Sequence, residues 1–431
     1  SPNIHASMAT WLVARGNKQE ADAMIERKEY LQRLYDWKDE QVIKVVTGIR
    51  RCGKSTLLKQ YQEKLMQSGI LPEQIISINF EDLEYEELLD YKALYRYIKE
   101  RLCEGKMTYI FLDEIQKVDS FEKAVDSIYI KDMTDIYITG SNAYMLSGDL
   151  ATLLTGRYVE ISMLPFSFRD YYALTAPELS PDAAFADYMR YGGFPYLSTM
   201  KKTPEKAAVY LEGIYNTVII KDIEDRQNRR ENDPSKRKIT DIALLKTIAR
   251  YMASVVGSPV SVKSVTDYLT SNGRKISPNT VSDYMEALKE SFIFYKADRI
   301  DIVGKQFLKS NSKWYVVDLG LRSHMLPRQK YDLGFSIENI VYFELLRRGC
   351  QVNIGKSGNT EVDFVAHSQD ACCYFQVTAD MTSEETFSRE MRPLESIRDN
   401  YEKTVLTLDR FTAGNYNGIK VINVIDWLLN P

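Results

Sequence analysis

The sequence is poor in cysteine and histidine and has no long apolar run, and each shortage excludes a class of protein. The five cysteines form no Cys-x-x-Cys pair and only three histidines are present, which argues against a structural zinc site. No apolar stretch approaches the roughly 18 residues that span a bilayer, and the N-terminus lacks the pattern of a secretory signal. We therefore expect a cytoplasmic protein without a membrane partner.

Length and charge predict several domains with a basic middle. A chain of 431 residues exceeds one compact core, so about two to four domains are expected. Residues 226–330 carry 20 Lys and Arg against 10 Asp and Glu, whereas residues 331–431 and 1–225 have net charges of −6 and −8. Such a basic segment is typical of a protein that binds duplex DNA. The alternative is that it docks on the acidic parts of its own chain.

The clearest motif is a phosphate-binding loop. Gln41–Thr47 is a β-branched run typical of a buried strand, Gly48–Ser55 reads GIRRCGKS, and a helical pattern follows. Strand, glycine loop and helix in that order are the context that this motif requires. Glycines let backbone N–H groups surround phosphates. Lys54 is expected to neutralise the β- and γ-phosphates, while Ser55 binds Mg²⁺.

The loop predicts ATP and Mg²⁺ as cofactors. The residues expected to bind the nucleotide are Gly48, Arg50, Arg51, Cys52, Gly53, Lys54, Ser55 and Thr56. The two arginines either touch phosphate or face the acidic pair Glu81 and Asp82.

A pair of carboxylates follows a second buried strand. Tyr109–Leu112 is the apolar run, and Asp113 and Glu114 come directly after it. In open α/β sheets this end of a strand is where ligands bind. Asp113 is expected to hold Mg²⁺ together with Ser55, and Glu114 to polarise the attacking water. The pair therefore indicates hydrolysis.

Further strands complete a five-stranded, mostly parallel sheet, an α/β fold of the doubly wound P-loop type. These strands are Ile75–Phe80, Asp135–Thr139 and Arg157–Ile161. Asn142, which follows the second of them, either reaches the γ-phosphate or caps a turn. Arg157 and Arg190 are candidates for a cation that arrives from a neighbouring subunit or a moving domain, and the alternative for each is a structural ion pair. The catalytic candidates are thus Lys54, Glu114, Asn142 and Arg157.

Several longer strings resemble one protein family. They are Thr47–Thr56 (TGIRRCGKST), Phe111–Gln116 (FLDEIQ), Thr139–Asn142 (TGSN), Leu164–Phe168 (LPFSF), Tyr191–Pro195 (YGGFP), Val316–Arg322 (VVDLGLR), Ile337–Val341 (IENIV) and Glu361–Phe364 (EVDF). Over nearly the whole chain from Met24, the sequence resembles AAA-type ATPases of bacteria and archaea that carry an uncharacterised C-terminal domain. The resemblance implies an ATPase domain, a winged-helix segment and a C-terminal domain of PD-(D/E)xK nuclease-like topology. It also implies a sensor 1 role at Asn142 and allows a homo-oligomer.

The basic middle has the pattern of a winged helix. Three helical patterns and two strands lie there: Leu244–Val256, Val262–Leu269, Asn279–Leu288, Phe292–Lys296 and Trp314–Val317. Three helices and a hairpin within a basic segment are typical of DNA binding. The third helix carries the acids Asp283 and Glu286, so contacts to phosphate have to come from the cations around it, which are Arg274, Lys275, Arg299, Lys305 and Lys309. The alternative is a module that packs on protein.

The C-terminal part has an incomplete nuclease pattern. Metal-dependent nucleases of this type need acids on a helix and a strand, and an acid-x-Lys on the next strand. Here Glu338 begins a helical pattern, Asp363 lies in the strand Val362–Val365, and Gln376 and Thr378 lie in the following strand. Thr378 stands where lysine is needed and cannot replace a cation. Unless Lys356 reaches in, we expect a degenerate site in an inactive, nuclease-like fold.

These patterns divide the chain into five segments. Residues 1–23 form a tail whose first seven residues look artificial, with Met8 or Met24 as the natural start. The others are the ATPase core at 24–170, a helical lid at 171–235, a winged-helix-like domain at 236–325 and the nuclease-like domain at 326–431. The expected function is Mg²⁺-dependent ATP hydrolysis that drives a switch, with DNA as a candidate partner. The alternatives are an ATP-controlled nuclease and a binding module that does not hydrolyse ATP.

Overall fold

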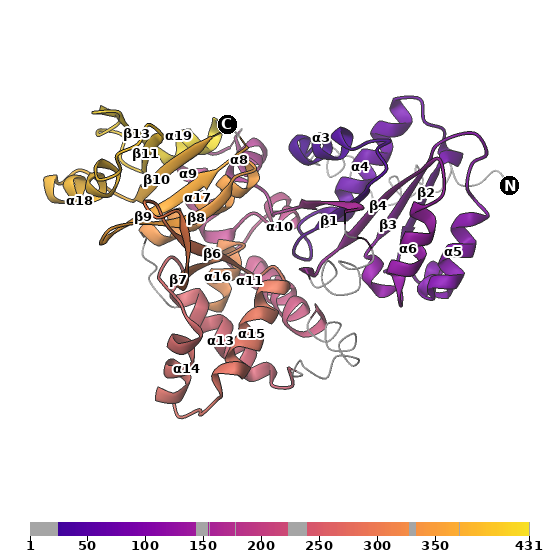
Figure 1. The fold of residues 1–431 in the computed structure, drawn as a ribbon, viewed down its shortest axis with the longest axis horizontal. Coiled ribbons are helices and arrows are strands. Elements are labelled where there is room, and N and C mark those ends of the chain that lie inside the picture. The colour runs from indigo at the N-terminus through magenta and orange to yellow at the C-terminus, as the bar shows by residue number, and fades with distance from the viewer. Residues whose placement is uncertain are drawn as a thin grey trace.

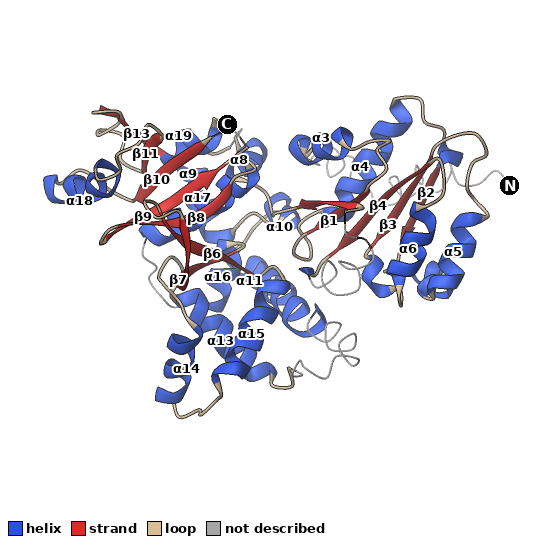
Figure 2. Ribbon diagram, viewed as in Figure 1, coloured by secondary structure: helices blue, strands red, loops and turns tan. Residues whose placement is uncertain are grey.

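The computed structural model describes residues 25–143, 154, 156–176, 178–222, 239–326, 333–369 and 371–430. It contains two β-sheets with helical segments between them (Figures 1 and 2). In Figure 1 the first sheet lies on the right, the second on the upper left, and the helices of residues 242–290 at the bottom. None of the described helices combines the length and apolar composition that crossing a membrane requires. The predicted tail, residues 1–23, lies outside the described residues.

The first sheet has five strands, all parallel, in the order β2-β3-β4-β1-β5. The strands are β1 (Ile43–Thr47), β2 (Ile75–Asn79), β3 (Thr108–Asp113), β4 (Thr134–Gly140) and β5 (Tyr158–Ser162). Every residue of β1 and β3 is buried, as expected for a parallel sheet covered on both faces. The predicted five-stranded sheet is thus confirmed.

Helices cover both faces of this sheet. The helices are α3 (Lys28–Asp36), α4 (Lys54–Gln67), α5 (Tyr91–Lys99) and α6 (Phe121–Tyr129), with short 3₁₀ segments at Pro72–Gln74, Leu83–Leu89 and Ile115–Lys117. Apolar side chains of α3 and α4 pack with Val46 and Phe111, whereas those of α5 and α6 pack with Val45 and Ile110. The alternation of strand side chains between faces therefore separates two core layers. The first layer continues without a break into the C-terminal half.

Helices form the middle of the chain. They are α8 (Phe168–Thr175), α9 (Pro181–Tyr191), α10 (Pro195–Thr199), α11 (Pro204–Asn216), a π-helical turn Thr217–Asp222, α13 (Ile242–Ser254), α14 (Val262–Ser271), α15 (Pro278–Glu290) and α16 (Leu319–Met325). The three helices predicted between residues 244 and 288 are confirmed as α13, α14 and α15. Each begins after a side chain that accepts from its first turn, namely Asp241, Ser261 and Ser277.

The second sheet is mixed and has eight strands in the order β12-β13-β11-β10-β9-β8-β6-β7. The strands are β6 (Phe294–Asp301), β7 (Gln306–Val316), β8 (Gln351–Ser357), β9 (Thr360–His367), β10 (Cys372–Thr378), β11 (Glu402–Thr407), β12 (Gly414–Tyr416) and β13 (Ile419–Asn423). The helices around them are α17 (Leu333–Arg347), α18 (Glu384–Glu395) and α19 (Val424–Leu429).

The hairpin predicted to be a wing belongs to this second sheet. Strands β6 and β7 pair antiparallel, as expected, but Arg299–Asp301 of β6 also pairs in parallel with Ile354–Lys356 of β8. The hairpin is therefore an edge of the C-terminal sheet, which corrects the expectation of a separate wing. The sequence hides this pairing because the two strands are joined through α16 and α17 and not by a turn.

Candidate nucleotide site

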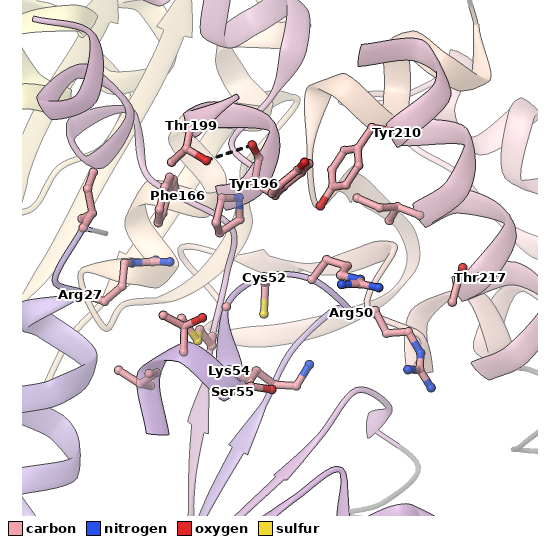
Figure 3. A pocket seen from close by; sticks show the side chains of 18 of the residues that line it. Arg27, Arg50, Cys52, Lys54, Ser55, Phe166, Tyr196, Thr199, Tyr210 and Thr217 are labelled. Carbon is pink, nitrogen blue, oxygen red and sulfur yellow. Dashed lines mark hydrogen bonds between the residues drawn. The ribbon is translucent and has the colours of Figure 1, made fainter. Parts of the chain in front are cut away.

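A cavity of about 880 Å³ opens at the carboxyl ends of the parallel strands (Figure 3). The phosphate loop and the start of α4 form one wall, and α10 and α11 form the opposite wall with Tyr196 and Tyr210. The lining residues are Ile25, Arg27, Arg50, Arg51, Cys52, Gly53, Lys54, Ser55, Thr56, Leu57, Gln60, Glu81, Glu114, Met163, Phe166, Pro195, Tyr196, Thr199, Val209, Tyr210, Gly213, Ile214 and Thr217. All the predicted nucleotide-binding residues except Gly48 are among them.

The loop has the tight backbone that its glycines predict. Gly48 has a φ of +149°, and a Cβ there would lie 2.2 Å from the carbonyl oxygen of Met163. Gly53 has a φ of +106° and directly precedes α4. Only glycine tolerates these positions, so the loop can bring its amides to the end of the helix. Cys52 is buried and burial raises the pKa of its thiol, consistent with a small side chain that fills space.

Lys54 lies between the loop and the acidic pair. Its Nζ donates to the carbonyl oxygens of Gly48 at 2.9 Å and Ile49 at 3.3 Å, and lies 3.7 Å from Oε1 of Glu114. The side chain is buried. A phosphate that enters the loop would meet a cation already placed there.

Asp113 and Glu114 are joined through Thr139 at the end of β4. Thr139 Oγ1 donates to Oδ1 of Asp113 at 2.6 Å and accepts from the amide of Glu114 at 2.9 Å. Burial raises the pKa of Asp113, although hydrogen bonds from Ser55 and Thr139 act in the opposite direction. The sequence did not single out Thr139, and its position at a strand end next to the acids was the available signal.

Glu114 is held by two further polar side chains. Gln116 donates to its Oε2, and Ser141 donates to the same atom at 3.1 Å. Burial acts to raise the pKa of Glu114, but the charges of Lys54 and Arg50 and the hydrogen bonds from Gln116 and Ser141 together lower it. The carboxylate is therefore charged and fixed, as a group that polarises water must be. Gln116 was missed by the sequence reasoning, since it follows the motif by two positions.

The remaining predicted residues separate into two groups. Asn142 is buried at the end of β4, beside Ser141, so the predicted polar strand end is present. Arg157 instead precedes β5 and pairs with Asp126, with its guanidinium 5.4 Å from the ring centre of Tyr129. Arg157 lies beside the amino-terminal ends of the parallel strands, because it precedes β5 and its carbonyl oxygen accepts from the amide of Ile43 at the start of β1. The phosphate loop follows the carboxyl-terminal end of β1, so the two are at opposite ends of the strands. Within this chain Arg157 therefore makes the structural ion pair that was the alternative, and its role at the site of a neighbouring subunit stays a prediction.

Arg190 and the loop arginines have distinct surroundings. The Arg190 guanidinium lies 5.1 Å from the ring centre of Tyr191 and Arg190 does not line the cavity. Arg50 lines the cavity and pairs with Glu81 at 3.0 Å, which is the second alternative for this residue, and its contact with phosphate stays a prediction. Arg51 lines the cavity with a φ of +67°.

The residues fit a magnesium ion bound with a nucleotide. Ser55, at the start of α4, hydrogen bonds to Asp113 at the end of β3. This bond places a hydroxyl and a carboxylate together. Mg²⁺ prefers such oxygen ligands and usually takes only one or two from protein, with phosphates and water supplying the rest. In the described residues no three His, Cys, Asp or Glu side chains are grouped to hold a metal by themselves.

The nuclease-like residues do come together, with an unpredicted lysine among them. Glu338 lies inside α17, which begins earlier than predicted, and faces Lys313 of β7 at 3.1 Å. Lys313 also lies 2.9 Å from Glu361 and 3.7 Å from Asp363.

The other two predicted residues of this group, on β10, are placed by hydrogen bonds. Gln376 accepts from the amide of Asp363 at 3.3 Å. Thr378 Oγ1 donates to the carbonyl oxygen of Asp380 at 3.2 Å. Lys313, and not Lys356, supplies the cation.

Sequence comparisons identify relatives along the chain. A profile described as an AAA domain matches residues 40–172, and one described as a domain of unknown function (DUF8612) matches residues 182–332. An uncharacterized protein of Haemophilus influenzae is 39% identical over 411 residues, 94% of this chain and 99% of that protein. An uncharacterized protein of Methanocaldococcus jannaschii is 28% identical over 347 residues, 76% of this chain and 73% of that protein.

Solved structures show only distant likeness. The Walker-type ATPase of Pyrococcus abyssi gives a TM-score of 0.47 at 16% identity, over 70% of this chain and 96% of that chain. The Orc1 protein of Aeropyrum pernix, solved with DNA, gives 0.28 at 14% identity, over 71% of this chain and 93% of that chain. These values are too low to say anything about function.

Proposed function

The chain belongs to the same family as the Haemophilus influenzae protein, and we propose that its AAA ATPase domain binds ATP with Mg²⁺ and hydrolyses it. The observation that carries this proposal is that Lys54 and Glu114 line one cavity 3.7 Å apart, while Asp113 hydrogen bonds to Ser55, which also lines it. Lys54 neutralises phosphate oxygens, and Asp113 with Ser55 would hold the magnesium ion, which supplies further neutralisation when bound. Glu114, fixed by Gln116 and Ser141, orients and polarises the attacking water.

We propose that hydrolysis drives a switch. Two of the hydrogen bonds at or beside the cavity lining reach the C-terminal half. The amide of Gly193 donates to Asp318 at 2.7 Å, and Arg347 of α17 donates to the carbonyl oxygen of Phe166 at 3.4 Å. Phe166 lines the cavity. A nucleotide that moves this wall would therefore move α16 and α17 with it. The proposal keeps the domain limits predicted from the sequence. The β6–β7 hairpin lies within the predicted winged-helix-like domain, 236–325, but pairs with a strand of the nuclease-like domain, 326–431.

DNA is a second candidate partner, supported by the positive charge of residues 226–330. Several cations of this segment form ion pairs within the chain: Arg274 with Asp241, Lys289 with Glu286, Lys296 with Asp298, Arg299 with Glu361, and Lys313 with Glu338. The pairs of Arg299 and Lys313 reach acidic residues outside the segment and support docking within the chain, whereas the other three pairs lie inside the segment. Eight others, Arg226, Arg229, Arg230, Lys236, Arg237, Lys238, Arg328 and Lys330, lie outside the described residues.

The test is ATP turnover with and without duplex DNA, in the wild type and in Glu114→Gln. We expect the wild type to hydrolyse ATP and the variant to bind it while losing at least about 100-fold in turnover, since removing a group that positions water costs two or more orders of magnitude. Stimulation by DNA would support DNA as the partner. A wild type that binds ATP without turning it over under any condition would make the chain a nucleotide-gated binding module.

A further inference from the structure

The positive charge at the nucleotide cavity comes mainly from the phosphate loop itself. Four described lining residues carry it: Arg27, Arg50, Arg51 and Lys54. The wall formed by α10 and α11 contributes tyrosine, threonine and apolar side chains but no cation. Arg27 donates through Nη2 to the carbonyl oxygen of Leu164 at 3.1 Å and its Nε lies 3.4 Å from Asp170, while its buried Nη1 has no hydrogen-bond partner. Arg50 and Arg51 differ from Arg27 in belonging to the phosphate loop itself.

Arg50 is the loop arginine that lies at the acidic end of the cavity. Its side chain is 12% exposed and its Nη1 lies 3.0 Å from Oε1 of Glu81. Burial favours the neutral form of Glu114, and Arg50, with Lys54, is one of the charges close enough to outweigh burial and lower its pKa. Glu114 is the carboxylate placed to act on water at the γ-phosphate, so Arg50 lies near the same point.

We propose that Arg50 contacts the γ-phosphate of ATP from within the same chain, and that Glu81 holds it when the site is empty. This inference rests on the proposed ATPase function and names a further catalytic residue for it. Negative charge spreads over the γ-phosphate oxygens as the bond to the leaving ADP breaks, and a guanidinium presents several donors to such oxygens. No cation from another subunit is then needed.

The pair with Glu81 is suited to exchange. Glu81 is about half exposed, at 49%, so water screens the attraction and the pair contributes little stability. A phosphate carries more charge and competes well for the guanidinium. Lys117 Nζ lies 4.0 Å from the same Glu81 oxygen, so Glu81 keeps a positive partner when Arg50 turns away.

The experiment compares Arg50→Ala, Arg50→Lys and Glu81→Gln with the wild type in kcat, KM and ADP affinity. We expect Arg50→Ala to lose about 100-fold or more in kcat, in line with the effect of late-arriving arginines, while ADP affinity changes less than threefold. Arg50→Lys should recover only part, and Glu81→Gln should strengthen binding of ATP over ADP. Arg96→Ala, an exposed arginine of α5, is the matched charge control.

The outcomes separate this inference from the proposed function. If Glu114→Gln abolishes turnover and Arg50→Ala keeps kcat within twofold of the wild type, hydrolysis stands and the role of Arg50 is overturned. If the wild type shows no turnover, the readout becomes the ratio of affinities for a non-hydrolysable ATP analogue and ADP. Arg50→Ala should then lower the preference for the triphosphate, and an unchanged ratio overturns the inference.

A second inference concerns the nuclease-like residues and is independent of the nucleotide site. The atoms that would bind a metal there already have partners inside the protein. Oε1 of Glu338 accepts from Lys313 at 3.1 Å and from the hydroxyl of Tyr315 at 2.6 Å. Oδ2 of Asp363 accepts from the amide of Val377 at 2.9 Å. Gln376 donates through its amide nitrogen to Glu390 at 3.1 Å.

The positive charge in this cluster is also supplied from inside. Lys313 Nζ contacts three carboxylates, those of Glu338, Glu361 and Asp363, and its side chain is 4% exposed. Arg299 lies 3.2 Å from Glu361 and adds a second cation. A divalent ion at the same carboxylates would have to overcome repulsion from Lys313 at short range.

We infer that Lys313 occupies the role of the divalent ion in this cluster, so that the cluster is a closed joint between β7 and α17. The joint ties the helical segment, which ends in the β6–β7 hairpin, to the helix that carries Arg347. A buried cation that pairs with several carboxylates costs much when one partner is removed, so this joint fixes the two elements without catalysing cleavage.

The test uses Mn²⁺ without nucleotide. The thermal unfolding midpoint of the wild type should not change with Mn²⁺, and Mn²⁺ should not produce DNA cleavage. Lys313→Met should unfold at lower temperature and regain part of the loss with Mn²⁺, whereas Lys313→Met with Glu338→Gln should not respond. Wild-type cleavage or Mn²⁺ binding that disappears in Glu338→Gln would overturn the inference, and this measurement does not depend on whether Lys313→Met folds.

Discussion

The amide of Gly193 donates a hydrogen bond of 2.7 Å to Oδ2 of Asp318, which joins the loop above the nucleotide cavity to the start of α16. Asp318 also caps α16, because its Oδ1 accepts from the amide of Leu321 at 3.1 Å. A Cβ on Gly192 would lie 2.0 Å from the same carboxylate. The backbone at Gly192 and Gly193 therefore packs closely against Asp318. Pro195, two residues after Gly193, lines the cavity.

This contact predicts a stability that depends on pH. Burial raises the pKa of Asp318 to about 6, although three backbone amides act in the opposite direction. An acid with a raised folded pKa costs nothing below its unfolded pKa and costs stability as pH rises through the folded one. A difference of about two units corresponds to about 3 kcal/mol. The unfolding free energy of the wild type relative to Asp318→Asn should therefore fall by up to about 3 kcal/mol between pH 4 and 7.

Thermal unfolding of both proteins across this pH range provides the measurement. Taking the difference between the two proteins removes the titration of all other groups. A difference that does not vary with pH would mean that Asp318 has an ordinary pKa in the folded protein.

Arg347 should affect nucleotide binding from outside the cavity. It donates to the carbonyl oxygens of Pro165 at 3.0 Å and Phe166 at 3.4 Å. Arg347→Lys keeps the charge but loses the Nη2 that makes both bonds. We therefore expect about 1–3 kcal/mol of lost stability and a several-fold higher KM for ATP. Arg348→Lys is the control on the same helix, because Arg348 contacts Trp427 and Glu344. Equal KM values in the two variants would contradict a link through α17.

Thr139→Val should weaken the binding of Mg²⁺ at the site. The hydroxyl of Thr139 donates a hydrogen bond that orients Asp113, and it also accepts one from the amide of Glu114. Valine has the same shape but leaves that buried amide without an acceptor, at a cost of about 1–3 kcal/mol. We expect a higher Mg²⁺ concentration for half-maximal turnover. Titration of Mg²⁺ at saturating ATP measures it, and an unchanged midpoint would show that Asp113 is oriented without Thr139.

Gln116 is predicted to position Glu114 and not to bind the nucleotide. Gln116→Ala removes a donor to Glu114 Oε2 and leaves the Ser141 bond in place. We expect kcat to fall by about tenfold, less than for Glu114→Gln, with KM nearly unchanged. Gln116→Glu should be worse, since a second carboxylate would repel Glu114. A rise in KM alone would assign Gln116 to binding.

The sequence by itself determined the nucleotide site and the sheet that carries it. Gly48, Gly53 and Lys54 lie within one short segment, and their geometry follows from local backbone constraints. The acids follow a strand that is apolar throughout, since both faces of a parallel sheet are buried. The sequence also predicted the other three strands of this sheet, β2, β4 and β5. Such features need no knowledge of distant contacts, which is why Asp113 and Glu114 were identified before the fold was known.

Only the tertiary structure decided which distant residues meet. Lys313 lies in β7 and reaches Glu338 because β7, β6 and β8 share a sheet, and no spacing in the sequence encodes that pairing. Arg157 adjoins β5 of the sheet that carries the phosphate loop, but it lies at the amino-terminal end of that strand. The loop lies at the carboxyl-terminal ends, so the direction of the strands keeps the two apart. Side-chain partners between remote segments depend on how the layers pack, and burial then decides their charges.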